Sequence, residues 1–249
     1  MLNKVPEVTL IFWAIKVLST TVGETGADYL AVHVGLGANV TTACMASLLL
    51  AALILQLRTR RYVPSIYWLT VVLVSTVGTE ITDLLTDRLE ISLYVSTVVF
   101  ACTLAVTFAI WFAVERTLSI RTIATTRREL FYWAAVLVTF ALGTAAGDLA
   151  TEALGLGFGL GVVVFGVLIA FVAVFYTLGV NPVLTFWLAY ILTRPLGASL
   201  GDLLSQSRNY GGVGLGTVNT SLAFLTMIIA LVAWVTFEGE HSEGADPAR

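Results

Sequence analysis

Apolar residues occur along the chain in runs of about 20 residues, separated by short polar or glycine-containing segments. An α-helix rises about 1.5 Å per residue, so a run of this length crosses a hydrocarbon layer about 30 Å thick. The pattern therefore predicts eight membrane-spanning helices. Their expected ranges are 8–33, 39–57, 67–86, 92–114, 131–153, 158–178, 183–206 and 216–237.

Every second predicted helix carries the same pattern, in which a tryptophan is followed ten residues later by a glycine and fifteen residues later by an aspartate. We number each copy from its tryptophan as position 0. Self-similarity at fixed spacing is the sign of a repeat architecture, so we predict four two-helix units over about 8–57, 67–114, 131–178 and 183–237. The four sets are Trp13, Gly23 and Asp28; Trp68, Gly78 and Asp83; Trp133, Gly143 and Asp148; and Trp187, Gly197 and Asp202.

Each unit holds an even number of spans, so the four patterned helices are expected to run in the same direction. The copies begin 55, 65 and 54 residues apart. The longer middle interval favours two halves related by an axis along the membrane normal.

Composition agrees with this pattern, because 58% of the residues are hydrophobic and only 12% are charged. Such a chain cannot keep its surface in water as a globular protein. Cys44 and Cys102 both lie inside apolar runs, which argues against a disulfide framework or a cysteine metal site. The expected fold is an all-α polytopic membrane protein with a single transmembrane domain, 1–237.

Basic residues gather on the side where the patterned helices begin, and they set the expected orientation. By the positive-inside rule, both termini are expected on the cytoplasmic side of the cell (inner) membrane. The polar tail 238–249 is expected to be disordered there, and the four tryptophans to be interfacial anchors. The basic residues on this side are Lys4, Arg58, Arg60, Arg61, Arg116, Arg121, Arg127 and Arg128, whereas Arg88 and Arg208 fall on the other.

Acidic residues dominate the outer half of the patterned helices, close to position 15. A charge inside the membrane costs about 2.5–3.5 kcal/mol even on the lenient insertion scale. The excess of acids must therefore be protonated, hydrated or neutralised by a bound cation. The acids are Glu24, Asp28, Glu80, Asp83, Asp87, Asp148, Glu152 and Asp202, and the bases inside the spans are Lys16 and Arg194.

Small residues at positions 10 and 14 run beside these acids in every copy. In lipid, small residues four apart let helix backbones approach closely, so we expect the acids at helix contacts facing the bundle interior. In the fourth copy, Pro195 is expected to kink its helix. The pairs are Gly23 and Ala27, Gly78 and Thr82, Gly143 and Gly147, and Gly197 and Gly201.

If a cation binds, the ligands favour a hard ion such as Mn²⁺, Mg²⁺, Ca²⁺, Na⁺ or H⁺, since histidine and paired cysteines are scarce. The leading hypothesis is a transporter or exporter of such a cation. The alternatives are a non-transporting sensor or assembly protein whose buried acids serve helix packing, and a site where Lys16 and Arg194 hold an anionic or organic ligand. The expected cation ligands are Glu24, Asp28, Glu80, Asp83, Asp148 and Asp202.

No zinc-protease motif, nucleophile–histidine pair or phosphate loop stands out, so an enzyme is not expected. The expected partners are the lipid bilayer and a small cation, with a homo-oligomer left open and no nucleic acid. No other cofactor is expected.

The copies resemble a tandem-repeat family of bacterial integral-membrane proteins of unknown function. The resemblance rests on the segments 19–28, 75–83, 143–148 and 195–202, each of which ends in the position 15 aspartate. It covers nearly the whole chain except the tail, and it implies no particular activity or ligand.

Overall fold

The computed structural model describes residues 3–28 and 38–244, apart from the side chains of residues 24, 27, 28, 38, 87 and 239–244. Its long helices match the predicted ones to within a few residues, except at the C-terminal end of the chain, and residues 29–33 of the first predicted helix lie outside the described residues. They are α1 (Leu10–Asp28), α2 (Ala38–Arg58), α3 (Pro64–Asp83), α4 (Leu93–Glu115), α5 (Thr126–Asp148), α6 (Gly157–Thr177), α7 (Pro182–Ser205) and α8 (Thr217–Gly244). The fold is all-α in the part of the chain that is described, as predicted.

Seven of these helices are long and apolar enough to cross a membrane, and α1 contains a shorter apolar stretch, Leu10–Gly23. The helices α3, α5 and α7 bury 56–61% of their apolar windows, whereas α2, α4, α6 and α8 bury only 11–22%. The chain therefore has an inner and an outer set of helices. The outer helices α2, α4, α6 and α8 are the second helices of the four repeats.

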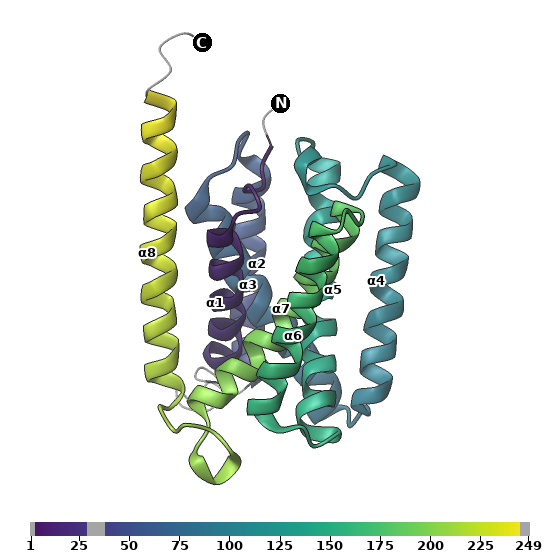
Figure 1. Ribbon diagram of the computed structural model, residues 1–249, viewed down its shortest axis with the longest axis vertical. Coiled ribbons are helices and arrows are strands. Elements are labelled where there is room, and N and C mark those ends of the chain that lie inside the picture. Colours follow the sequence, from purple (N-terminus) through teal and green to yellow (C-terminus); the bar gives the residue numbers. More distant parts are fainter. Residues whose placement is uncertain (1–2, 29–37, 245–249) are drawn as a thin grey trace.

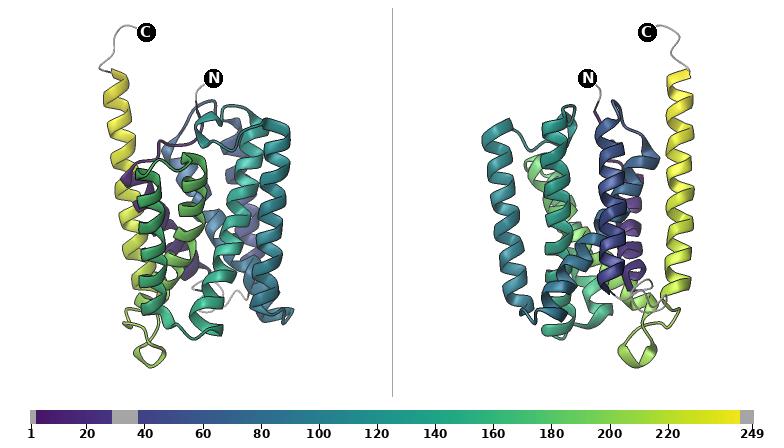
Figure 2. Two further views of the ribbon diagram at one scale, coloured as in Figure 1. Left: turned by 45° about the vertical axis from the view of Figure 1, so that its right-hand side comes forward. Right: turned by 180° about the vertical axis from the view of Figure 1, so that it is seen from behind.

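The inner helices form a closed ring, in which α1 contacts α3, α3 contacts α5, α5 contacts α7, and α7 returns to α1. Each outer helix packs on the inner helix of the next repeat: α2 on α3, α4 on α5, α6 on α7, and α8 on α1 (Figures 1 and 2). All four units pack on the next unit in the same way. The division into two halves, expected from the long middle interval, is therefore not seen in the helix contacts. Because α3, α7 and α8 surround α1, this helix needs fewer apolar residues than a lipid-facing span.

The glycine at position 10 of each repeat makes the ring contact. A Cβ added to Gly78 would lie 2.7 Å from the Cβ of Phe140, and one added to Gly143 would lie 2.5 Å from the Cβ of Arg194. The other two glycines come equally close to the next helix, Gly23 to Ser75 and Gly197 to Thr20. All four contacted residues stand at position 7 of the following repeat, so one contact occurs four times and closes the ring.

The small residue at position 14, one turn later, makes a similar close contact with the residue at position 8 of the next repeat. A Cβ on Gly147 would lie 3.3 Å from that of Pro195, and one on Gly201 would lie 3.2 Å from Cγ2 of Thr21. At the equivalent place in α3, the Thr82 hydroxyl donates a hydrogen bond of 3.1 Å to the carbonyl of Ala141. The small-residue row therefore mediates close helix contact, as predicted.

The tryptophans are not interfacial anchors as a set, because Trp68, Trp133 and Trp187 are buried inside the bundle. They pack with a second row of aromatic residues that directly precedes the tryptophans, at position −1. The Tyr67 and Tyr132 hydroxyls lie 2.5 Å apart in this layer. Together the two rows close the end of the ring at which the inner helices begin. The residues at position −1 are Phe12, Tyr67, Tyr132 and Phe186.

A buried ion pair reinforces the same end, where Lys4 Nζ lies 2.7 Å from the Glu129 carboxylate. Lys4 also donates to the carbonyl of Leu57, and the Gln56 amide donates to the other Glu129 oxygen over 3.0 Å. Both charged residues are nearly inaccessible to solvent. This network fastens the N-terminal segment to α2 and α5.

The helix α1 begins, and α8 ends, at this same end of the molecule, and α8 extends beyond the other helices (Figure 1). We expected residues 238–249 to be disordered, but α8 continues to Gly244, which corrects that prediction for the first part of the tail. A helix in progress extends at low cost, because each added residue brings one hydrogen bond.

Candidate functional site

Arg194 lies at the centre of the ring and reaches the other three inner helices. Its Nε donates to the Thr144 hydroxyl of α5 over 3.1 Å, and one terminal nitrogen donates to the Thr20 carbonyl of α1 over 3.3 Å. The other terminal nitrogen donates to the Thr79 hydroxyl of α3. The side chain is buried, and α7 continues as a helix through Pro195. Thr79 and Thr144 both stand at position 11 of their repeats.

Lys16 is the second buried cation of the ring interior. Its Nζ lies 3.8 Å from the ring centroid of Phe140 and 4.3 Å from that of Tyr190. No hydrogen-bond partner lies within reach of this ammonium in the described structure. Cation–π contacts contribute about 2 kcal/mol when desolvated, less than the several kcal/mol that burying an ammonium costs.

Both cations cross the ring along its diagonals. Lys16 extends from α1 to Phe140 on α5, and Arg194 extends from α7 to Thr79 on α3. Neither pair of helices is adjacent in the ring. The two side chains therefore bring positive charge to the centre of the bundle, close to a set of hydroxyl groups.

Most of these hydroxyls are already used in backbone contacts. Thr21 Oγ1 donates to the Gly197 carbonyl of α7 over 2.9 Å, and Thr139 Oγ1 donates to the Val136 carbonyl over 2.6 Å. Ser19 and Ser75 differ, because their buried hydroxyl oxygens have no hydrogen-bond partner in the described structure. The threonines therefore serve packing, whereas these two serines have unused hydrogen-bonding capacity.

Glu80 is a buried acid of the inner helix α3, with an exposed fraction of 7%. It follows Thr79 directly on α3, so it lies at the level of the Arg194 contacts. The Thr42 hydroxyl of α2 lies nearby. No other donor among the described residues lies at hydrogen-bonding distance from either carboxylate oxygen. An ionised carboxylate here needs water or a cation.

The position 15 aspartates Asp83, Asp148 and Asp202 lie beyond Glu80, at the ends of the inner helices, and are half-buried. Asp83 and Asp148 each end an α-helix that continues directly as a π-helix, Leu84–Arg88 and Leu149–Ala153. π-helical turns often occur at functional sites. Among the described side chains, no three acids, histidines or cysteines lie close enough together to hold a metal ion.

Four further acids of the sequence are either exposed or have side chains outside the described part of the structure. The side chains of Glu24, Asp28 and Asp87 lie outside the described residues, so their expected roles stay predictions. By repeat register, Glu24 shares position 11 with Thr79 and Thr144. Glu152 is exposed, at the outer end of the bundle.

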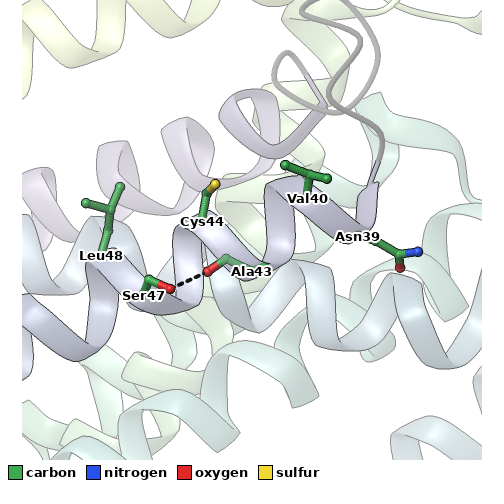
Figure 3. Close-up of a pocket in the computed structure, with 6 residues that line it drawn as sticks. All are labelled: Asn39, Val40, Ala43, Cys44, Ser47 and Leu48. Carbon is green, nitrogen blue, oxygen red and sulfur yellow. Dashed lines mark hydrogen bonds between the residues drawn. The ribbon is translucent and has the colours of Figure 1, made fainter.

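A shallow depression of about 620 Å³ lies on the outer face of α2 and is shown in Figure 3. All its lining residues come from this one helix, and the Ser47 hydroxyl donates to the Ala43 carbonyl over 2.7 Å. This surface is exposed and mainly apolar, so it does not share the chemistry of the ring interior. Its lining residues are Asn39, Val40, Ala43, Cys44, Ser47 and Leu48.

Sequence reasoning missed the position 11 threonines and the position −1 aromatics. The aromatic row was visible as a signal, because an aromatic residue precedes the tryptophan in all four copies. The Lys4–Glu129 pair had no such signal, because its members are far apart in sequence. The sequence marked Lys16 as a base inside the spans but not its surroundings, and in the described structure it lies against two aromatic rings.

The ring, its lipid-facing outer helices and its buried polar interior define an all-α polytopic membrane protein built from repeated helix pairs. The chain belongs to the family described as a repeat of unknown function, DUF347, whose profile matches residues 11–62, 66–117, 131–178 and 185–240. These four matches coincide with the four predicted units. No curated protein and no solved structure matches the chain.

Proposed function

We propose that the protein is a membrane transporter of a small hard cation, whose path follows the axis of the inner ring. The observation that carries the proposal is Glu80, a buried carboxylate of the inner helix α3 whose one nearby donor in the described structure is the Thr42 hydroxyl of α2. Such a group favours a cation or a proton as its partner, because an uncompensated charge in the membrane is costly.

Three half-buried aspartates at the outer end of the ring support an entry site, since they lie on the same inner helices as the path. In this proposal Asp83, Asp148 and Asp202 attract the cation, and Glu80 receives it. Carboxylates and hydroxyls select hard ions, which include Mn²⁺, Mg²⁺, Ca²⁺, Na⁺ and H⁺. Glu24 and Asp28 belong to the same proposed ligand set by their repeat positions.

Arg194 acts in the proposal as a tethered cation that competes with the transported ion. Its hydrogen bonds to Thr79 and Thr144 place the guanidinium beside Thr79, the residue that directly precedes Glu80 on α3. A fixed positive charge beside the acid weakens cation binding, which favours release over tight retention. We further propose that the end carrying the basic residues faces the cytoplasm of a cell (inner) membrane.

Ion flux into proteoliposomes tests this function, with indicators for Mn²⁺, Mg²⁺, Ca²⁺, Na⁺ and H⁺ trapped inside. We expect flux of at least one cation, strongly reduced in Glu80→Gln and Asp83→Asn and unchanged in Glu90→Gln, which alters an exposed acid. Folding of each variant is checked by circular dichroism. Absence of flux for every ion, or full flux in a folded Asp83→Asn/Asp148→Asn/Asp202→Asn variant, would contradict the proposal.

The second candidate is a non-transporting sensor or assembly protein whose polar interior sets helix packing. It is favoured by the threonine hydroxyls that bond backbone carbonyls between helices, such as Thr21 to Gly197. Under this reading, the acid variants change the unfolding midpoint or oligomeric state, and the intact protein transports no ion.

A further inference from the structure

The described centre of the ring holds two buried cations, and one of them, the Lys16 ammonium, has no hydrogen-bond acceptor. Lys16 has an exposed fraction of 1% and its three N–H donors meet no acceptor in the described structure. The proposed cation path does not use this group. Its surroundings therefore need a partner that accepts hydrogen bonds and carries negative charge.

The two cations come from α1 and α7 and contact consecutive turns of α5. Lys16 Nζ packs over the Phe140 ring, and Arg194 Nε bonds the Thr144 hydroxyl one turn later on α5. Two like charges that contact consecutive turns of one helix, in a layer shielded from water, favour an anion near them.

Further donors stand on the same side of α1. Ser19 follows Lys16 by three residues and so shares its helical face. Ser75 of α3 packs against Gly23, which is one turn beyond Ser19 on α1. The hydroxyls of both serines are buried and without a partner in the described structure. An ammonium and two hydroxyls form a donor set typical of small-anion binding.

We propose that the ring axis between Lys16 and Arg194 is a binding site for a small monovalent anion, held by the Lys16 ammonium and the Ser19 and Ser75 hydroxyls. Arg194 contributes its charge, while its own hydrogen bonds keep it in place. The Phe140 face carries no hydrogen-bond donor, so few donors remain for a divalent oxyanion. A halide or a small carboxylate fits this chemistry. The bound anion would also lower the barrier that two axial cations present to a transported cation, although the site itself does not depend on transport.

Thermal unfolding of the purified, detergent-solubilised protein tests the site. Sodium chloride or sodium acetate replaces sodium gluconate at constant sodium concentration and pH. Above the dissociation constant of the anion, each tenfold rise in its concentration should lower the unfolding equilibrium constant about tenfold. If only chloride stabilises the protein, the site binds halides. If acetate stabilises it as well, the site also accepts small carboxylates.

We expect Lys16→Met to abolish this dependence, and Arg121→Met, which alters an exposed basic residue, to keep it. If Lys16→Met does not fold, Lys16→Gln replaces it, and isothermal titration of chloride into the folded wild-type protein provides a second measurement. An unfolding midpoint of the wild-type protein that is equal in all three salts, or an equal rise in the Lys16 variant, would overturn the proposal.

Discussion

Gly143 on α5 faces Arg194 on α7 so closely that a methyl group on the glycine would lie 2.5 Å from the arginine Cβ. The lack of a side chain at position 10 is thus what lets the buried arginine lie at the helix contact. The same relationship between positions 10 and 7 joins the other three neighbouring pairs of inner helices. One repeated small residue therefore determines how the four units assemble.

Replacing Gly143 by alanine should destabilise the protein by about 1–3 kcal/mol, the usual cost of inserting a methyl group into a packed core. The measurement is the unfolding midpoint in mixed micelles with increasing SDS. Gly166→Ala on α6 is the matched control, because a Cβ there meets no atom within 4 Å. That control should be neutral or slightly stabilising, as alanine favours helix. Equal midpoints for both variants would contradict the ring contact.

Thr144→Val should destabilise the fold by about 1.5–3 kcal/mol, because it removes a hydrogen bond to the buried Arg194 guanidinium. Thr107→Val is the control, since this hydroxyl is half-buried on the outer helix α4 and donates to the Thr103 carbonyl of its own helix. The same SDS titration compares the two. If Thr144→Val behaves like Thr107→Val, Arg194 does not depend on this contact.

Glu129→Ala should destabilise the closed end of the ring by about 3–5 kcal/mol, because it leaves the Lys4 ammonium buried without its partner. Cleavage of the N-terminal segment by a protease should also become faster, since the pair fastens this segment to α5. Glu7→Ala, which removes an exposed acid from the same segment, should leave both quantities unchanged. Slow cleavage of Glu129→Ala would argue against the fastening role.

The sequence was sufficient to predict the eight helices, the four repeats and the close contacts at Gly78 and Gly143, because spacing and side-chain size are local properties. It did not show that each repeat contacts the next one in a closed ring, since partner choice depends on the three-dimensional path of the chain. The tryptophan prediction failed for a related reason. In the sequence, a tryptophan near a helix end has the same spacing whether it belongs to a lipid-facing belt or to a buried layer.

The candidate site was only partly predictable. The burial of Lys16, Glu80 and Arg194 follows from their place in patterned helices, and the structure bears it out. The position of Lys16 against Phe140 does not follow from sequence, because the two residues belong to helices on opposite sides of the ring. A buried charge can be predicted from the chain, but its partner cannot.

Closure of the ring between the first and fourth repeats is the central claim, and a disulfide across α1 and α7 tests it most directly. A Cβ on Gly201 would lie 3.2 Å from Cγ2 of Thr21, which brings the two Cβ atoms within the range of a disulfide. Cys44 and Cys102 are first replaced by alanine, and Thr21→Cys is combined with Gly201→Cys. We predict an intramolecular cross-link on oxidation, seen as a mobility shift on a non-reducing gel, and none when Thr21→Cys is combined with Gly166→Cys. Failure of the Thr21–Gly201 pair to cross-link within one folded chain would contradict the closed ring.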